Sequence, residues 1–180
     1  MRALFPDALR PIRLRNFRRD RRGAAAVEFA LVSVPFFALV FAIVETALVF
    51  FAGHVLENGV TQAARLIRTG QAQQQQLDQS AFKQEVCARI TGLFNCEGGL
   101  KLDVRIFKDF GEIDLSAPID DDGNLDDDFV FEPGSGGEIV VVRAFYEWPT
   151  FVPGFGNNPT KLANGKRLLA SAATFRNEAF

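Results

Sequence analysis

The fold is decided by residues 24–53, AAAVEFALVSVPFFALVFAIVETALVFFAG, a stretch whose only charged side chains are Glu28 and Glu45. A helix of about 20 residues crosses the roughly 30 Å hydrocarbon core of a bilayer, so this stretch is long enough to span one. Pro35 removes one backbone hydrogen bond, and we expect a kink at residues 31–35, which membrane helices tolerate. The sequence therefore predicts one transmembrane helix over residues 24–53.

Charge is distributed unequally around this stretch. Residues 1–22 hold eight arginines and two aspartates, a net charge of +6, whereas residues 23–180 hold 12 basic and 20 acidic residues, a net charge of −8. Arginine clusters stay on the cytoplasmic side of a membrane helix. We therefore expect residues 1–23 to form a basic cytoplasmic leader and the C-terminal part to be exported. A removable secretory signal is the alternative, but the apolar run is long for one and no clear A-x-A site follows it.

Composition restricts the chemistry that this chain of 180 residues can perform. It has one histidine and two cysteines, which leaves little for histidine-based triads or multi-histidine metal sites. His54 lies just beyond the apolar run, where an interfacial surface role is favoured over that of a general base. We expect no enzyme activity and no cofactor; an exported, membrane-anchored hydrolase is the minor alternative. A basic arm followed directly by an apolar run also argues against nucleic acid as a partner.

The two acidic residues within the apolar run need a reason, because carboxylates in hydrocarbon are costly and often functional. Glu28 sits near the predicted cytoplasmic edge. Glu45 lies near the opposite interface, where snorkelling or a bond to Thr46 would account for it.

Helical spacing continues past the apolar run to residue 70. The apolar residues of this extension, which Gly70 is expected to end, are Leu56, Val60, Ala63, Ala64 and Ile67. A helix from residue 24 to 69 is too long for the bilayer alone, at 1.5 Å per residue. Its outer half must therefore pack against the chain's own C-terminal domain or the same helix in a neighbouring copy.

Residues 71–180 carry the pattern of a small α+β domain. The run QAQQQQ at 71–76 is polar and of low complexity, which is typical of a flexible connector. Ser80 is expected to cap a helix over 81–94, with an apolar stripe of Phe82, Val86, Ile90 and Phe94. Strands are predicted at 100–107, 138–148 and 167–176. These elements suggest a small antiparallel sheet packed on helices, at the end of a long N-terminal helix.

Cys87 and Cys96 flank the end of the predicted helix at 81–94. In an oxidising compartment a disulfide between them would close a short loop. A metal pair is the alternative, but the C-x8-C spacing has no nearby histidine and lacks the tight spacing of a zinc site. The disulfide is the favoured interpretation.

Two loop segments leave alternatives open. Residues 119–129 concentrate oxygen ligands around Gly123, with Asp120, Asp122, Asn124 and Asp126 as a weak calcium candidate. The spacing is not that of an EF-hand, so a solvated acidic loop is favoured over calcium binding. A further alternative function, that of a calcium-sensing adhesin, would require this loop to bind calcium. The aromatic, proline-broken stretch at 148–155 either covers the core or dips into the membrane interface.

Several motifs together resemble a known family. The stretch RRGAAAVEFALV at 21–32 is similar to the prepilin-peptidase site of the tight-adherence (Flp) pilus system. Further similar segments are VTQAARLIRTGQAQ at 60–73, the pair Cys87 and Cys96, FYEWPTFVPGFG at 145–156 and TFRNEAF at 174–180. In combination they resemble the TadE-like pseudopilins.

The resemblance implies specific roles for the residues at the leader junction. The peptidase would cut after Gly23, so that Ala24 becomes the first and Glu28 the fifth residue of the mature chain. Phe29 stands where the family usually has tyrosine, which keeps the ring and loses the hydroxyl. Gly23, Ala24, Glu28 and Phe29 are therefore the candidate processing and assembly residues.

The implied function is a non-enzymatic pseudopilin or minor pilin that assists assembly of a tight-adherence pilus. Its implied partners are a prepilin peptidase, pilin and other pseudopilin subunits, the inner-membrane assembly platform and membrane lipid. The implied location is the bacterial inner membrane, in a single pass with a cytoplasmic N-terminus and a periplasmic C-terminal domain; entry into the filament stays open. The alternative is an uncleaved, single-pass scaffold of the pilus machinery.

Overall fold

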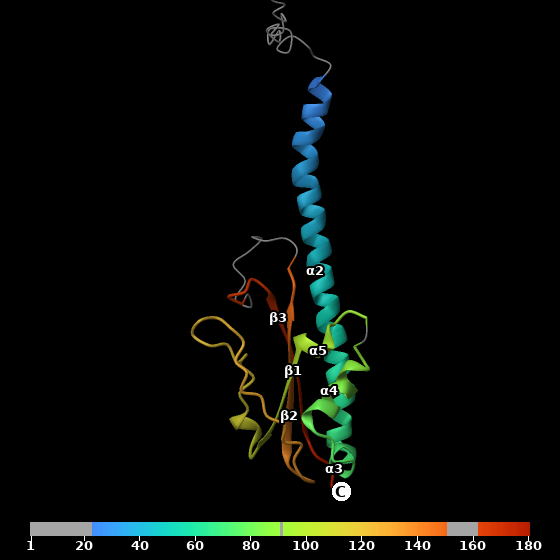
Figure 1. Ribbon diagram of the computed structural model, residues 1–180, viewed down its shortest axis with the longest axis vertical. Helices are drawn as coiled ribbons and strands as arrows, with labels where there is room; N and C mark the ends of the chain where they lie inside the picture. Colours follow the sequence, from blue (N-terminus) through green and yellow to red (C-terminus); the bar gives the residue numbers. More distant parts are fainter. Residues whose placement is uncertain (1–22, 91, 151–161) are drawn as a thin grey trace, which may run out of the picture. The chain divides into compact units, whose positions relative to one another are not determined.

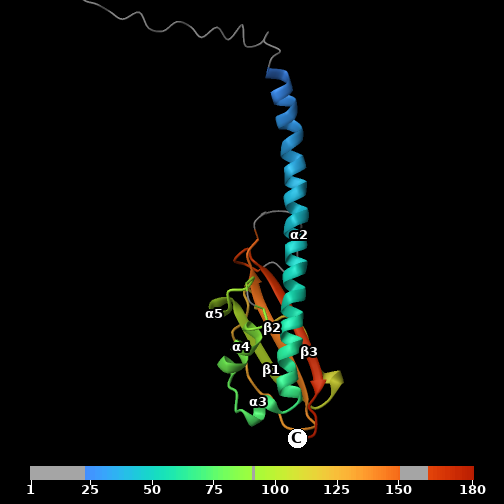
Figure 2. The same cartoon turned by 90° about the vertical axis from the view of Figure 1, so that its right-hand side faces the viewer.

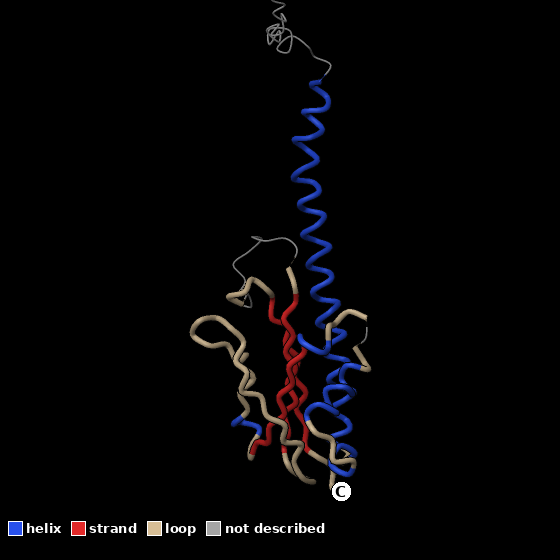
Figure 3. Tube along the Cα trace, viewed as in Figure 1, coloured by secondary structure: helices blue, strands red, loops and turns tan. Residues whose placement is uncertain are grey.

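The computed structural model describes residues 23–90, 92–150 and 162–180. Most of the basic leader and most of the aromatic stretch at 148–155 lie outside these residues. The chain divides into two compact units, residues 1–41 and 42–180. Both the helical and the sheet elements of the second unit are drawn in Figure 3.

The long helix α2 spans Ala24–Arg68 and continues through Pro35. It ends because Gly70 adopts a left-handed backbone conformation, with φ of 78°. The backbone N–H groups of Thr69 and Gly70 donate to the carbonyls of Arg65 and Ile67, which satisfies two of the last carbonyls of the helix. The end expected at Gly70 is thus confirmed.

The C-terminal half of α2 buries one face within the second unit. Its buried residues, three or four apart, are Val49, Ala52, Leu56, Gly59, Val60, Ala63, Ala64 and Ile67. Gly59 allows close approach, because a Cβ there would lie 2.2 Å from Cγ2 of Ile90. The outer half of the helix therefore packs on the chain's own C-terminal domain, which was one of the two partners expected from the length of the helix.

The glutamine-rich run is folded, so the prediction of a flexible connector is wrong. Residues Gln71–Gln74 form the short helix α3. The side-chain amide of Gln73 donates to the carbonyls of Pro133 and Gly134, at 2.9 and 3.0 Å. Long-range bonds of this kind are invisible to a composition argument.

The next helix, α4, spans Gln79–Cys87 and is shorter than the predicted 81–94. Its cap is Asp78, not Ser80: the Asp78 carboxylate accepts from the backbone N–H of Ala81 and from the Ser80 hydroxyl. The bond from Ala81 and then that from Ser80 lower the pKa of Asp78. Phe82, Val86 and Ile90 are buried as predicted, although Ile90 lies beyond the helix end.

Three strands form one antiparallel sheet in the order β1-β2-β3. They are β1 at Leu100–Phe107, β2 at Ile139–Trp148 and β3 at Arg167–Arg176. All three predicted strands are confirmed, with β2 beginning one residue later than expected. The α+β class, with a long apolar N-terminal helix, is confirmed too.

The sheet has a helix-facing side and an outer side. In the views of Figures 1 and 2, α2, α3 and α4 lie on one side of the sheet and the long β1–β2 connection lies on the other. Val140, Val142 and Ala144 of β2 pack with α2 and α4 in the main core. Phe145 and Leu168 point to the outer side, where Leu125 and Phe129 of the connection cover them. The connection also includes a short 3-10 helix, η2, at Phe110–Glu112.

A disulfide joins Cys87 at the end of α4 to Cys96 at the start of α5, Cys96–Gly99, with their Cα atoms 5.9 Å apart. Beside it, the ring of Phe94 meets that of Tyr146 edge-on at 4.8 Å. The Tyr146 hydroxyl accepts from the backbone N–H of Asn95 at 3.1 Å. The bond therefore closes a loop that is packed on β2.

Replacing Cys87 by serine is expected to destabilise the oxidised protein by about 2.5–3 kcal/mol, because the loop-closure constraint on the unfolded chain is lost. Thermal melting of the purified protein in detergent, with and without reductant, measures the effect. Wild type and variant should melt alike once fully reduced. A difference that persists under full reduction would assign the effect to packing at Cys87 and not to the bond.

Candidate functional site

The first turns of α2 hold the candidate processing residues. Gly23 directly precedes the helix, Ala24 is its first residue, and Glu28 follows one turn later. All three are exposed, and Phe29 is 72% exposed. Since residues four apart lie on the same helix face, Ala24 and Glu28 share one face of α2.

Large apolar side chains are exposed along α2 from Val27 to Phe51. They are Val27, Phe29, Leu31, Val32, Val34, Phe36, Phe37, Leu39, Val40, Phe41, Ile43, Val44, Leu48, Phe50 and Phe51. Soluble monomers rarely expose apolar patches of this extent. The helix is long and apolar enough to cross a membrane, which is consistent with a single span.

Hydroxyl groups in this apolar stretch are satisfied by the helix itself. The Ser33 hydroxyl donates to the carbonyl of Ala30 at 3.2 Å, and the Thr46 hydroxyl donates to the carbonyl of Ala42 at 2.8 Å. A polar group in hydrocarbon must find its partner within the protein. Both side chains therefore suit a lipid environment.

Comparison with known families bears on this same segment. The model of the family described as TadE-like protein matches residues 23–65. Over these residues the chain is similar to that family. The TadE-like family is associated with Tad pilus assembly. The match begins at Gly23 and covers the apolar run together with most of the buried extension of α2. The chain matched no curated protein and no solved structure.

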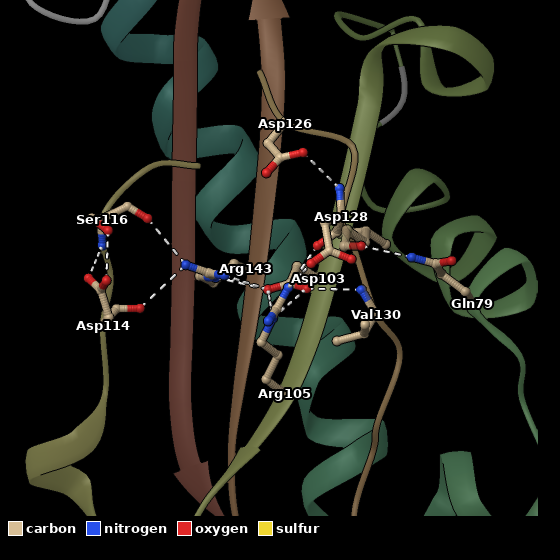
Figure 4. A network of polar contacts seen from close by, with 10 residues as sticks. Gln79, Asp103, Arg105, Asp114, Ser116, Asp126, Asp128, Val130 and Arg143 are labelled. Atoms are coloured by element: carbon tan, nitrogen blue, oxygen red, sulfur yellow. Dashed lines mark hydrogen bonds and ion pairs between the residues drawn. The ribbon is translucent and has the colours of Figure 1, made fainter. Parts of the chain in front are cut away.

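A buried carboxylate organises the outer side of the sheet, and sequence reasoning missed it. Asp103 of β1 has no exposed surface and lies opposite Arg143 of β2 in the strand register. Its oxygens accept from Nε and Nη2 of Arg143, at 3.0 and 2.7 Å, and from Nε of Arg105 at 3.0 Å (Figure 4). The backbone N–H of Val130 adds a further bond at 3.0 Å.

The two arginines extend this network to both halves of the β1–β2 connection. Nη1 of Arg143 donates to the carbonyls of Asp114 and Ser116, at 3.3 and 3.2 Å. Nη2 of Arg105 donates to the carbonyl of Asp128 at 2.7 Å. The Ser116 backbone N–H, then its hydroxyl and, least, Arg143 hold the pKa of Asp114 below its usual value. The network thus holds the β1–β2 connection against the sheet, which is a structural role.

The acidic loop closes on itself. The Asp120 carboxylate accepts from the backbone N–H of Asn124 at 2.7 Å, and Gly123 supplies the left-handed turn with φ of 81°. The Asp126 carboxylate accepts from the N–H of Asp128 at 3.3 Å, and Asp122 lies at the turn. In residues 23–90, 92–150 and 162–180, no three His, Cys, Asp or Glu side chains are placed to hold a metal ion. The loop's geometry fits the solvated-loop interpretation.

His54 lies on the exposed face of α2. Its Nδ1 is 3.6 Å from a carboxylate oxygen of Glu57, and the two side chains are 74% and 65% exposed. An exposed pair of this kind fits the surface role expected from the sequence.

Proposed function

We propose that this protein is a non-enzymatic pseudopilin or minor pilin that assists assembly of a tight-adherence (Flp) type pilus, after a prepilin peptidase has cut behind Gly23. One observation carries the proposal: the TadE-like match starts at Gly23, the residue that precedes α2. The exposed apolar stretch of α2 and the folded unit that follows it in the sequence suit a protein that is held in a membrane and works by association.

The proposed organisation assigns a task to each segment. Residues 1–23 form the cleaved cytoplasmic leader, 24–53 the transmembrane helix, 54–70 its packed extension and 71–180 the periplasmic α+β domain. The peptidase would act on Gly23 and Ala24, whereas Glu28 and Phe29 would act in processing and assembly. The proposed partners are that peptidase, pilin and pseudopilin subunits, the inner-membrane assembly platform and membrane lipid.

An uncleaved inner-membrane scaffold is the second candidate. It shares the membrane helix and the exported domain, and differs in keeping residues 1–23. Intact-mass measurement of the membrane-extracted protein separates the two candidates directly.

Reporter fusions test the proposed topology. We expect a phosphatase fused after Phe180 to be active and a cytoplasmic reporter at the same place to be inactive, because the eight arginines of residues 1–22 hold the N-terminus in the cytoplasm. An inactive phosphatase beside an active cytoplasmic reporter would reverse the orientation.

A further inference from the structure

A groove of about 550 Å³ lies between α2 and β3 in the second unit. Its helix wall includes Val49, Phe50 and Gly53, which belong to the end of the apolar run. Its strand wall runs from Arg167 to Ala172. A Cβ built at Gly53 would meet nothing within 4 Å, so there is open space at this wall.

Hydrogen-bond donors without acceptors gather at the strand wall. Side chains alternate along a strand, so Arg167 and Ser171 share the helix-facing side of β3 with Leu169, which packs in the main core. The Ser171 hydroxyl is buried and has no hydrogen-bond partner in the described parts of the chain. Within the same parts, the guanidinium of Arg167 forms no ion pair or hydrogen bond.

Trp148 has an unused donor too, but it packs in the main core and does not line the groove. It lies directly opposite Arg167 in the β2–β3 register and is only 7% exposed. Its buried indole Nε1 has no acceptor among the described residues. A buried donor without an acceptor costs free energy, which an acceptor-rich ligand would recover. Two donors line the groove, the Arg167 guanidinium and the Ser171 hydroxyl, and they call for a ligand that brings oxygen acceptors and negative charge.

The directions of α2 and β3 place the apolar wall and Arg167 at the same end of the groove. In both Figure 1 and Figure 2, α2 and β3 run in the same direction. Val49 and Phe50 therefore come first along α2, whereas Glu57, which pairs with His54, comes two turns later. Arg167, at the start of β3, therefore lies at the same end of the groove as Val49 and Phe50, whereas Glu57 and His54 lie toward Ser171. A molecule at the end near Val49 would meet apolar side chains and the guanidinium together.

We propose that this groove binds the headgroup region of one membrane phospholipid, an inference that rests on the proposed membrane span. Arg167 and the hydroxyl of Ser171 would bind the phosphate and ester oxygens, because a guanidinium pairs with phosphate through charge-assisted hydrogen bonds. Val49 and Phe50 would contact the first methylene groups of an acyl chain. Charge complementarity between Arg167 and phosphate selects this occupant over an uncharged peptide strand.

Native mass spectrometry of the full chain tests the proposal. The protein is reconstituted in phosphatidylethanolamine vesicles, extracted again in mild detergent, and the bound phospholipid per chain is counted. We expect one retained lipid in the wild type and a loss of about tenfold in Arg167→Gln, since a charged hydrogen-bond partner is removed. Gly53→Phe should also remove the lipid by filling the groove.

Arg176→Gln is the matched control, because Arg176 is an exposed arginine at the other end of β3. It should retain the lipid. Absence of lipid from the wild type, equal retention by Arg167→Gln, or an equal loss in Arg176→Gln would each overturn the proposal. Loss of co-purifying proteins with unchanged lipid in Gly53→Phe would make the groove a protein interface instead. Retention is measured whether or not the leader is cleaved or pili form, so its outcome is separate from that of the proposed function.

Discussion

Replacing Arg143 by methionine is expected to destabilise the protein by about 3–5 kcal/mol, because the wholly buried carboxylate of Asp103 loses its strongest partner. For a chain of this size the melting temperature should fall by roughly 10 °C. The β1–β2 connection should loosen first, since Arg143 also binds the carbonyls of Asp114 and Ser116. Thermal melting and amide hydrogen exchange measure both effects.

Lys101→Met is the matched control on β1. Lys101 pairs with Asp127 at 2.8 Å, but the two side chains are 41% and 78% exposed. Exposed ion pairs contribute only about 0–1 kcal/mol, so this variant should melt near the wild-type temperature. Equal melting of Arg143→Met and Lys101→Met would show that the buried network contributes little.

Glu28→Gln is expected to leave leader processing largely intact while piliation and association with pilin subunits fall strongly. Cleavage after Gly23 would create a charged amine on Ala24, with a reference pKa of about 7.7–8.0. In a bundle of staggered parallel helices, Glu28 of one copy could pair with that amine in the next. Two opposite charges about 4 Å apart attract by about 4 kcal/mol at an effective dielectric constant of 20, before desolvation is subtracted.

Gly23→Ala is the companion variant, and its phenotype should differ from that of Glu28→Gln. It should hinder cleavage and leave the leader attached, because the prepilin-peptidase site that residues 21–32 resemble requires glycine before the cut. Immunoblots for processing, pilus counts and co-purification separate the two phenotypes. Normal pili and unchanged partners in Glu28→Gln would contradict the charge-pair hypothesis. They would favour the simpler account that the Glu28 side chain extends to the lipid headgroups.

Strand and helix positions followed from patterns that depend on neighbours in the sequence. Strand β1 alternates apolar and polar residues, and it begins and ends where that pattern placed it. The strand predicted at 167–176 also has the observed bounds. The end of α2 followed from Gly70 for the same reason. Local periodicity is a sufficient guide where burial on one face decides the structure.

Long-range contacts account for what the sequence did not reveal. The run at 71–76 looks flexible by composition, yet Gln73 is bound to residues 60 positions away. Asp103 looks like an ordinary polar residue of a half-buried strand until the register places Arg143 opposite it. The candidate processing residues could be named from the sequence, because their motif lies in one continuous segment and does not depend on long-range contacts. The family match covers the same segment.

The mass of the membrane-extracted protein tests the central proposal most directly. We expect a mature chain that begins at Ala24 and lacks Met1–Gly23. Recovery of the uncleaved chain of 19.9 kDa from cells that contain an active prepilin peptidase would contradict the pseudopilin assignment and favour the scaffold.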